Sequence, residues 1–122
     1  SVTIEVKEVT ADEKNVFLKV ELAFLKKEEI PFCYAEFVSI NKYEILDENG
    51  TVMIQKENAE ETYIINDGTA LLTLSVEKEK LVEGNTYVLE VEEFETLKKA
   101  DAPLHVKGGW ECEFKLVADK GK

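Results

Sequence analysis

A histidine, an aspartate and a cysteine near the end of the chain could together perform nucleophilic catalysis. His105 is the only histidine, Asp101 could orient its ring, and Cys112 or a serine could attack a substrate. Such catalysis needs the nucleophile, the base and the orienting group in contact. His105 follows Pro103 closely, which predicts a loop, whereas Cys112 alternates in phase with Trp110, which predicts core. We therefore expect a surface histidine beside a turn, no catalytic residues and no enzymatic activity.

Acidic residues offer two further kinds of chemistry. Glu111 and Glu113 would stand about 6.6–6.8 Å apart along one strand, and paired carboxylates hydrolyse glycosides. Every alternating strand has that spacing, so exposed sheet charge explains the pair. Calcium needs six to eight oxygen ligands, and two turns carry Asp or Asn, at 47–49 and 66–67. Neither has the spacing of a calcium loop, so we predict no metal or cofactor site; calcium binding remains the alternative.

The rare residues at the end of the chain are expected to be structural. A glycine-hinged turn should lead into a last strand whose inward face carries Trp110, Cys112, Phe114 and Leu116, although an exposed tryptophan could instead stack on a sugar. Cys33 would lie on the third strand of an immunoglobulin-like sheet, with the penultimate strand between it and Cys112. Two strand spacings are about 9.5 Å, beyond the roughly 7 Å that a disulfide spans. We predict two free, buried thiols.

Length and charge limit the classes of partner. The 122 residues suit one domain, 1–122, and they include 26 Asp and Glu against 15 Lys and Arg, for a net charge of −11. Such an acidic surface disfavours nucleic acid and anionic lipid. Solvation of exposed strands explains the acidity. No apolar run approaches 18 residues, so direct membrane insertion is not expected. Because the sequence begins within a strand-like segment, we expect a domain excised from a larger, membrane-anchored protein.

Apolar residues recur with a period of two, which is the pattern of a sheet with one solvent-exposed face. The clearest runs start at Val2, Val16, Leu72, Tyr87 and Trp110. About seven to nine such strands, separated by turns, predict an all-β fold: an immunoglobulin-like antiparallel β-sandwich.

Four segments of the chain carry less regular patterns. In the segment 32–40, apolar residues occupy even and odd positions alike, which predicts a strand covered on both faces. The segment 43–54 predicts a hairpin around Asn49-Gly50. Helical turns are expected at Ala59 to Thr62 and at Glu93 to Ala100.

Two segments resemble a known family. Gly84-Asn85-Thr86-Tyr87-Val88-Leu89-Glu90-Val91, then 102–114 with Gly109-Trp110-Glu111-Cys112-Glu113-Phe114, is similar to a G-x-x-Y-x-L-x-I strand, a loop and a final G-x-W-E-x-x-F strand. This pattern belongs to immunoglobulin-like ectodomains of Gram-positive, membrane-anchored, anti-sigma-factor-like proteins, domains of unknown function. Segment 2–22 and the turn at 47–50 also fit. The membrane helix and the sigma-binding part of such proteins lie outside these 122 residues.

The resemblance implies an extracytoplasmic location and no catalytic residues. The leading hypothesis is a non-catalytic sensor or interaction domain of a membrane-tethered regulator, with an unknown envelope ligand or protein as its partner. The alternatives are a cell-surface adhesion or carbohydrate-binding module and a structural spacer. A carbohydrate-binding module would require exposed aromatic rings, drawn from Tyr34, Phe37, Tyr43 and Tyr63.

Overall fold

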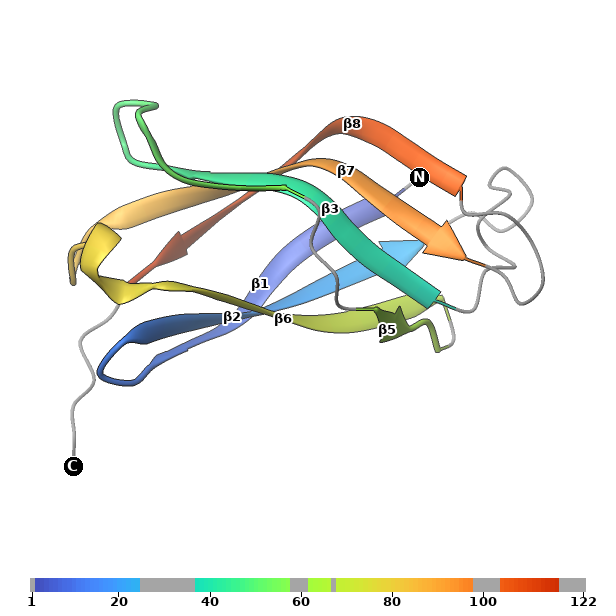
Figure 1. Cartoon of the computed structure of the whole chain (residues 1–122), viewed down its shortest axis with the longest axis horizontal. Helices are drawn as coiled ribbons and strands as arrows, with labels where there is room; N and C mark the ends of the chain where they lie inside the picture. Colours follow the sequence, from blue (N-terminus) through green and yellow to red (C-terminus); the bar gives the residue numbers. More distant parts are fainter. Residues whose placement is uncertain (1, 25–36, 58–61, 67, 98–103, 117–122) are drawn as a thin grey trace.

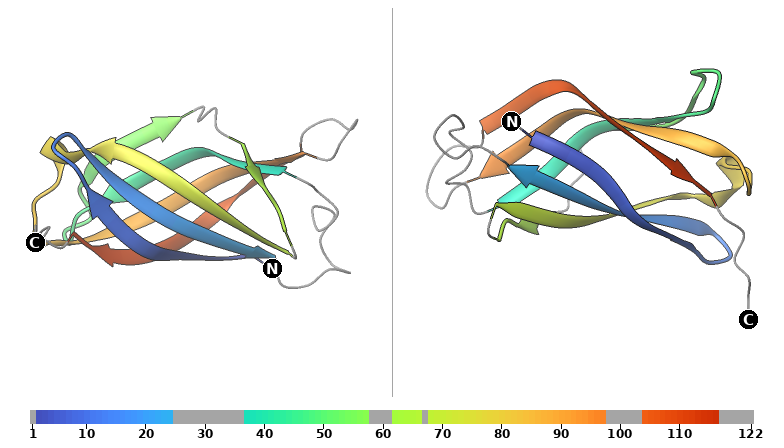
Figure 2. Two further views of the ribbon diagram at one scale, coloured as in Figure 1. Left: turned by 90° about the horizontal axis from the view of Figure 1, so that it is seen from below. Right: turned by 180° about the vertical axis from the view of Figure 1, so that it is seen from behind.

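The computed structural model describes residues 2–24, 37–57, 62–66, 68–97 and 104–116, which form two facing antiparallel sheets (Figure 1; Figure 2). Sheet A has the order β1-β2-β6, and sheet B has the order β4-β3-β7-β8, with β5 paired to β3. The bounds are β1 Val2–Ala11, β2 Asn15–Phe24, β3 Phe37–Leu46, β4 Val52–Glu57, β5 Tyr63–Ile64, β6 Thr69–Glu77, β7 Thr86–Leu97 and β8 Leu104–Lys115. These eight strands confirm the predicted immunoglobulin-like β-sandwich. A 3-10 turn, η3 (Lys78–Lys80), joins β6 to β7.

The core lies between the sheets and is filled by the inward side chains of every long strand. β2 and β6 follow the predicted alternation, so that one face of each strand is buried and the other is partly or fully exposed. β1 contacts β8 along one side of the sandwich, which brings its partly buried apolar residues against the same core. The side chains with the largest fully buried volumes are Tyr87, Phe94, Leu18, Leu22, Ile40, Ile45, Leu72, Leu89 and Leu116.

Tyr87 joins the core to the connection between the sheets. Its hydroxyl accepts a hydrogen bond from the backbone N–H of Val82 at 2.7 Å, while its ring packs against Phe114 with centroids 5.9 Å apart. The residue is only 1% exposed. A tyrosine near the start of this strand that bonds back to the preceding corner is a recurrent feature of immunoglobulin-like domains, where it is called a tyrosine corner. It fixes how the chain enters β7.

Irregular pairing crosses the middle of sheet B and reverses which residues face inward. The register of β3 against β7 shifts between Ile40 and Tyr43, and that of β7 against β8 shifts after Val91. Buried positions accordingly jump from Ile40 to Tyr43 in β3 and from Val91 to Phe94 in β7. A β-bulge inserts one residue and so exchanges the two faces of a strand. The shift places Glu93 on the outer face instead of in the core.

These irregularities correct three predictions. The segments 32–40 and 43–46 were expected to be separate strands, but residues 37–46 form the single strand β3; residues 32–36 lie outside the described part. The predicted helical turn from Glu93 is wrong, because β7 continues as a strand to Leu97. The glycine-hinged turn is also wrong: β8 begins at Leu104, and Gly108-Gly109 sits within it at the register shift. The other expected helical turn, at 59–62, lies outside the described residues except for Thr62.

Candidate functional site

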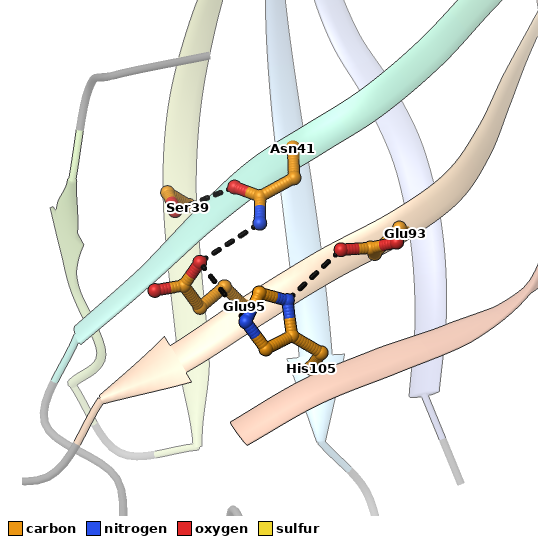
Figure 3. Close-up of polar contacts among 5 residues, drawn as sticks. All are labelled: Ser39, Asn41, Glu93, Glu95 and His105. Atoms are coloured by element: carbon orange, nitrogen blue, oxygen red, sulfur yellow. Dashed lines mark hydrogen bonds and ion pairs between the residues drawn. The ribbon is translucent and has the colours of Figure 1, made fainter. Parts of the chain in front are cut away.

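The outer face of sheet B carries a connected group of polar side chains from three strands (Figure 3). This group, the His105 network, consists of Ser39 and Asn41 from β3, Glu93 and Glu95 from β7, and His105 from β8. The bulge after Val91 turns both glutamates outward. The cross-strand pairing of Glu95 with His105 then brings the imidazole beside them.

Hydrogen bonds and ion pairs run through the His105 network without a break. The imidazole Nδ1 lies 2.9 Å from Glu93 Oε2, and Nε2 lies 3.8 Å from Glu95 Oε1. Asn41 Nδ2 donates to Glu95 Oε1 at 2.8 Å, and Ser39 Oγ lies 3.2 Å from Asn41 Oδ1. Figure 3 shows the imidazole lying between the two carboxylates. The side chains of Glu93 and Glu95 are 18% and 27% exposed, against 53% for His105.

The network favours the ionised form of Glu93. Its hydrogen bond with His105 is the main cause that lowers the pKa of Glu93, and Asn41 and the charges of His105 and Lys107 act in the same direction. A depressed carboxyl pKa contributes stability above the usual glutamate range, and that stability is lost as the pH falls through the lowered value. Glu93 is therefore negatively charged throughout the neutral range.

The structure separates the groups that the sequence suggested for nucleophilic catalysis. His105 lies within β8, not in a loop, and it points to the outer face, whereas Cys112 packs toward the core. These two side chains are on opposite faces of one strand. Asp101 lies outside the described residues. Ser39 is linked to His105 only through Asn41 and Glu95, and both ring nitrogens face carboxylates. The described geometry suits recognition by hydrogen bonds and charge.

Sequence reasoning missed four members of the network. Glu93, Glu95, Asn41 and Ser39 were not singled out, because their proximity depends on the register of three strands. One signal in the sequence points to the bulges. Adjacent polar residues separate two apolar positions three apart, as in Ile40-Asn41-Lys42-Tyr43. Such a break in alternation marks a change of face.

A row of three carboxylates crosses the same outer face beyond the bulges. Glu44, Glu90 and Glu111 are direct cross-strand neighbours on β3, β7 and β8. Gln55 of β4 donates a hydrogen bond to Glu44 at 3.0 Å. Burial is the first cause that raises the pKa of Glu90, followed by its charge repulsion and hydrogen bonding with Glu111. The expected pair Glu111 and Glu113 is exposed, but the interacting pair is formed across strands by Glu90 and Glu111.

Replacing Glu90 with glutamine should stabilise the protein at neutral pH by a few tenths of a kcal/mol to about 1 kcal/mol, because like charges directly opposite each other destabilise a sheet. The raised pKa means that the folded state binds a proton more tightly than the unfolded state. The gain in the free energy of unfolding should therefore be complete above the raised pKa of Glu90 and should vanish near pH 4. Urea unfolding at several pH values would measure it.

Glu113→Gln is the matched control for this substitution. Glu113 lies opposite Val88, so its directly opposing partner carries no charge. We expect a smaller change in the free energy of unfolding. An equal gain in the two variants would show that net charge, rather than the Glu90–Glu111 contact, is responsible.

Trp110 and Cys112 occupy the predicted inward face, but both are only half-buried because β8 is at the edge of sheet B. The indole lies against Phe94, with ring centroids 4.8 Å apart. It also covers Gly108, where an added Cβ would stand 2.9 Å from the indole Cη2 atom. Cys112 is a free thiol, and burial raises its pKa to about 11. Cys33 lies outside the described residues, although the predicted strand order β3-β7-β8 is confirmed.

The hairpin turn between β3 and β4 uses its acidic side chain to hold the backbone. Asp47 Oδ1 accepts hydrogen bonds from the N–H groups of Asn49 and Thr51 at 2.8 and 2.9 Å, and Gly50 has a positive φ of 82°. These bonds are those of an Asx turn. Within the described ranges, no group of three or more His, Cys, Asp or Glu residues is placed to hold a metal ion.

The aromatic residues that a carbohydrate site would require are largely covered. Tyr43 is 4% exposed and belongs to the core. Tyr63 is partly buried, and its hydroxyl donates to the carbonyl of Thr73 at 2.8 Å. Phe37 is partly buried beside β5. Tyr34 lies outside the described residues.

Comparisons with known proteins add little to this description. No known family matches the chain, and no curated protein does. Among solved structures, a β-glucosidase from Kluyveromyces marxianus is similar at a TM-score of 0.38 and 10% identity. The similarity covers 91% of this chain and 15% of the enzyme. In the described segments, no helix has the length and apolar character needed to cross a membrane.

Proposed function

We propose that this domain is a non-catalytic, extracytoplasmic sensor or interaction domain of a membrane-tethered regulator, similar to anti-sigma-factor-like proteins of Gram-positive bacteria. The resemblance of segments 84–91 and 102–114 to such ectodomains supports the location. The partner is an envelope ligand or protein that binds the outer face of sheet B.

The observation that carries the proposal is the His105 network. Its side chains come from three strands of one sheet, and a hydrogen bond links Asn41 and Glu95 before any partner arrives. Side chains that are already ordered lose little conformational entropy on binding. The network also offers an imidazole and carboxylate oxygens at the surface, which suits a partner with hydrogen-bond donors.

Two measurements on the full-length protein in intact cells test the proposal. A protease added outside the cells should digest the domain without lysis; protection until lysis would overturn the extracytoplasmic location. A photo-crosslinking amino acid is then placed at Lys107, which is exposed on the outer face of sheet B beside the network, or at Ser75, which is exposed on sheet A. Crosslinked products should form from Lys107 and not from Ser75. Equal crosslinking from both positions would contradict the assigned face.

A further inference from the structure

His105 brings the only imidazole of the sequence into the polar network on the outer face of sheet B. Histidine is the only residue type that normally changes charge between about pH 5 and 8. The thiol of Cys112, with its pKa raised to about 11, stays protonated there. A proton gained by the imidazole would act directly on the two contacts of His105 with Glu93 and Glu95.

The two contacts of the imidazole cannot both form when the ring is neutral. Nδ1 faces Glu93 and Nε2 faces Glu95. A neutral imidazole has one N–H and donates from one nitrogen only, whereas the protonated ring donates from both. If Nδ1 keeps its proton for Glu93, an Nε2 lone pair then faces the Glu95 carboxylate. Loss of the proton thus removes one of the two contacts that the His105 side chain makes with β7, while the backbone pairing of β8 with β7 remains.

Four other side chains from β3 and β8 lie around the two carboxylates that face the ring. Asn41 donates to the Glu95 oxygen that faces Nε2, so the link between β3 and β7 persists, and Ser39 bonds only to Asn41 in this network. Lys107, on the strand of His105, interacts with the charge of Glu93. Lys42 is the cross-strand neighbour of Glu93 on β3.

The affected contact lies at the end of an edge strand. β8 is the edge strand of sheet B, so within that sheet it pairs with β7 alone. Only the pairs from Leu104 to Lys107 lie beyond the register shift at Gly108-Gly109. Glycine has no side chain to pack and weakens a strand locally. Opening of such an end requires less free energy than unfolding of the core.

We propose that protonation of His105 fastens the first residues of β8 to β7 through Glu93 and Glu95, so that this end of sheet B opens more readily at pH 8 than at pH 5.5. This proton-dependent clamp does not depend on the proposed function. In an envelope domain, it would give the fold a direct response to acidification.

Amide hydrogen exchange of the isolated 122-residue chain tests the clamp. Protection factors, corrected for the intrinsic effect of pH, are compared at pH 5.5 and 8.0. The protected amides among residues 104–107 should be about threefold better protected at pH 5.5, an effect in the range of a partly exposed ion pair. Amides of β2 serve as the internal reference and should show no such difference.

Two variants separate the clamp from a general effect of pH. His105→Gln retains a side chain that forms hydrogen bonds but cannot gain a charge. Glu95→Gln leaves the contact between His105 and Glu93 in place but removes the carboxylate that faces Nε2. The difference between the two pH values should disappear in His105→Gln and shrink in Glu95→Gln. Equal protection of wild type at both pH values would overturn the clamp, as would an undiminished difference in His105→Gln.

Discussion

Replacing Phe94 with alanine is expected to lower the free energy of unfolding by about 3–5 kcal/mol, the range measured for buried aromatic residues. Phe94 is fully buried, and its ring contacts Trp110. It is also the first inward residue of β7 after the bulge. It therefore fills the core at the point where the bulge reverses which positions of the strand face inward. Because domains are stable by only about 5–15 kcal/mol, this loss would remove a large part of the total.

Urea unfolding followed by tryptophan fluorescence measures the effect of Phe94→Ala, since Trp110 is the only tryptophan and lies against the deleted ring. Phe94→Leu is the control: it retains most of the apolar volume and should lose clearly less stability. A loss below about 1 kcal/mol in the alanine variant would mean that position 94 is not part of the core. In that case the reversal of faces in β7 would be incorrect.

The same bulges explain how far the fold could be predicted from the sequence. Strands with uninterrupted alternation, such as β2 and β6, were predicted with the correct inward face. In the sequence of β7, the apolar residues Val91, Phe94 and Leu97 are spaced by three, and Val91 and Phe94 are both buried. Spacing of three is also typical of a helix, so the end of β7 was mistaken for a helical turn. A local pattern does not distinguish a bulge from a change in secondary structure.

The His105 network could not be predicted, because its members are far apart in sequence. Asn41 and Glu95 are hydrogen-bonded across a separation of 54 residues. Their meeting requires both the order β3-β7-β8 and the registers that the bulges shift. The strand order followed from the immunoglobulin-like architecture, and it is confirmed. The registers do not follow from the architecture. For this reason the sequence pairs His105 with Asp101, a neighbour in the chain, and not with the glutamates of the adjacent strand.

Edge position accounts for the remaining difference between expectation and structure. The alternation of apolar and polar residues alone correctly assigns one face of β8, which carries Trp110, Cys112, Phe114 and Leu116. Phe114 and Leu116 are buried, but Trp110 and Cys112 are only partly buried. Alternation identifies a face and not how completely the opposite sheet covers it. The predicted loss of 3–5 kcal/mol thus applies to Phe94, whereas substitution of the half-buried Trp110 should have a smaller effect.

Tyr87 gives the second large expected effect, and two substitutions divide it into parts. Tyr87→Phe retains the ring against Phe114 but leaves the Val82 N–H without its hydrogen bond. This hydrogen bond is only partly buried and Val82 is 59% exposed, so its loss should cost about 0.5–1.5 kcal/mol, the net contribution of a typical hydrogen bond. Tyr87→Ala removes the ring as well, so its loss should reach the range of about 3–5 kcal/mol for large aromatic residues.

Urea unfolding of both Tyr87 variants and of Phe114→Leu checks this division. Phe114→Leu weakens the ring contact while the hydroxyl bond remains, so it should lose less than Tyr87→Ala. The hydroxyl bond ties the β6–β7 connection to β7, which is the role of a tyrosine corner. If Tyr87→Phe is as stable as wild type, water replaces the hydroxyl at Val82, and the corner is held by ring packing alone.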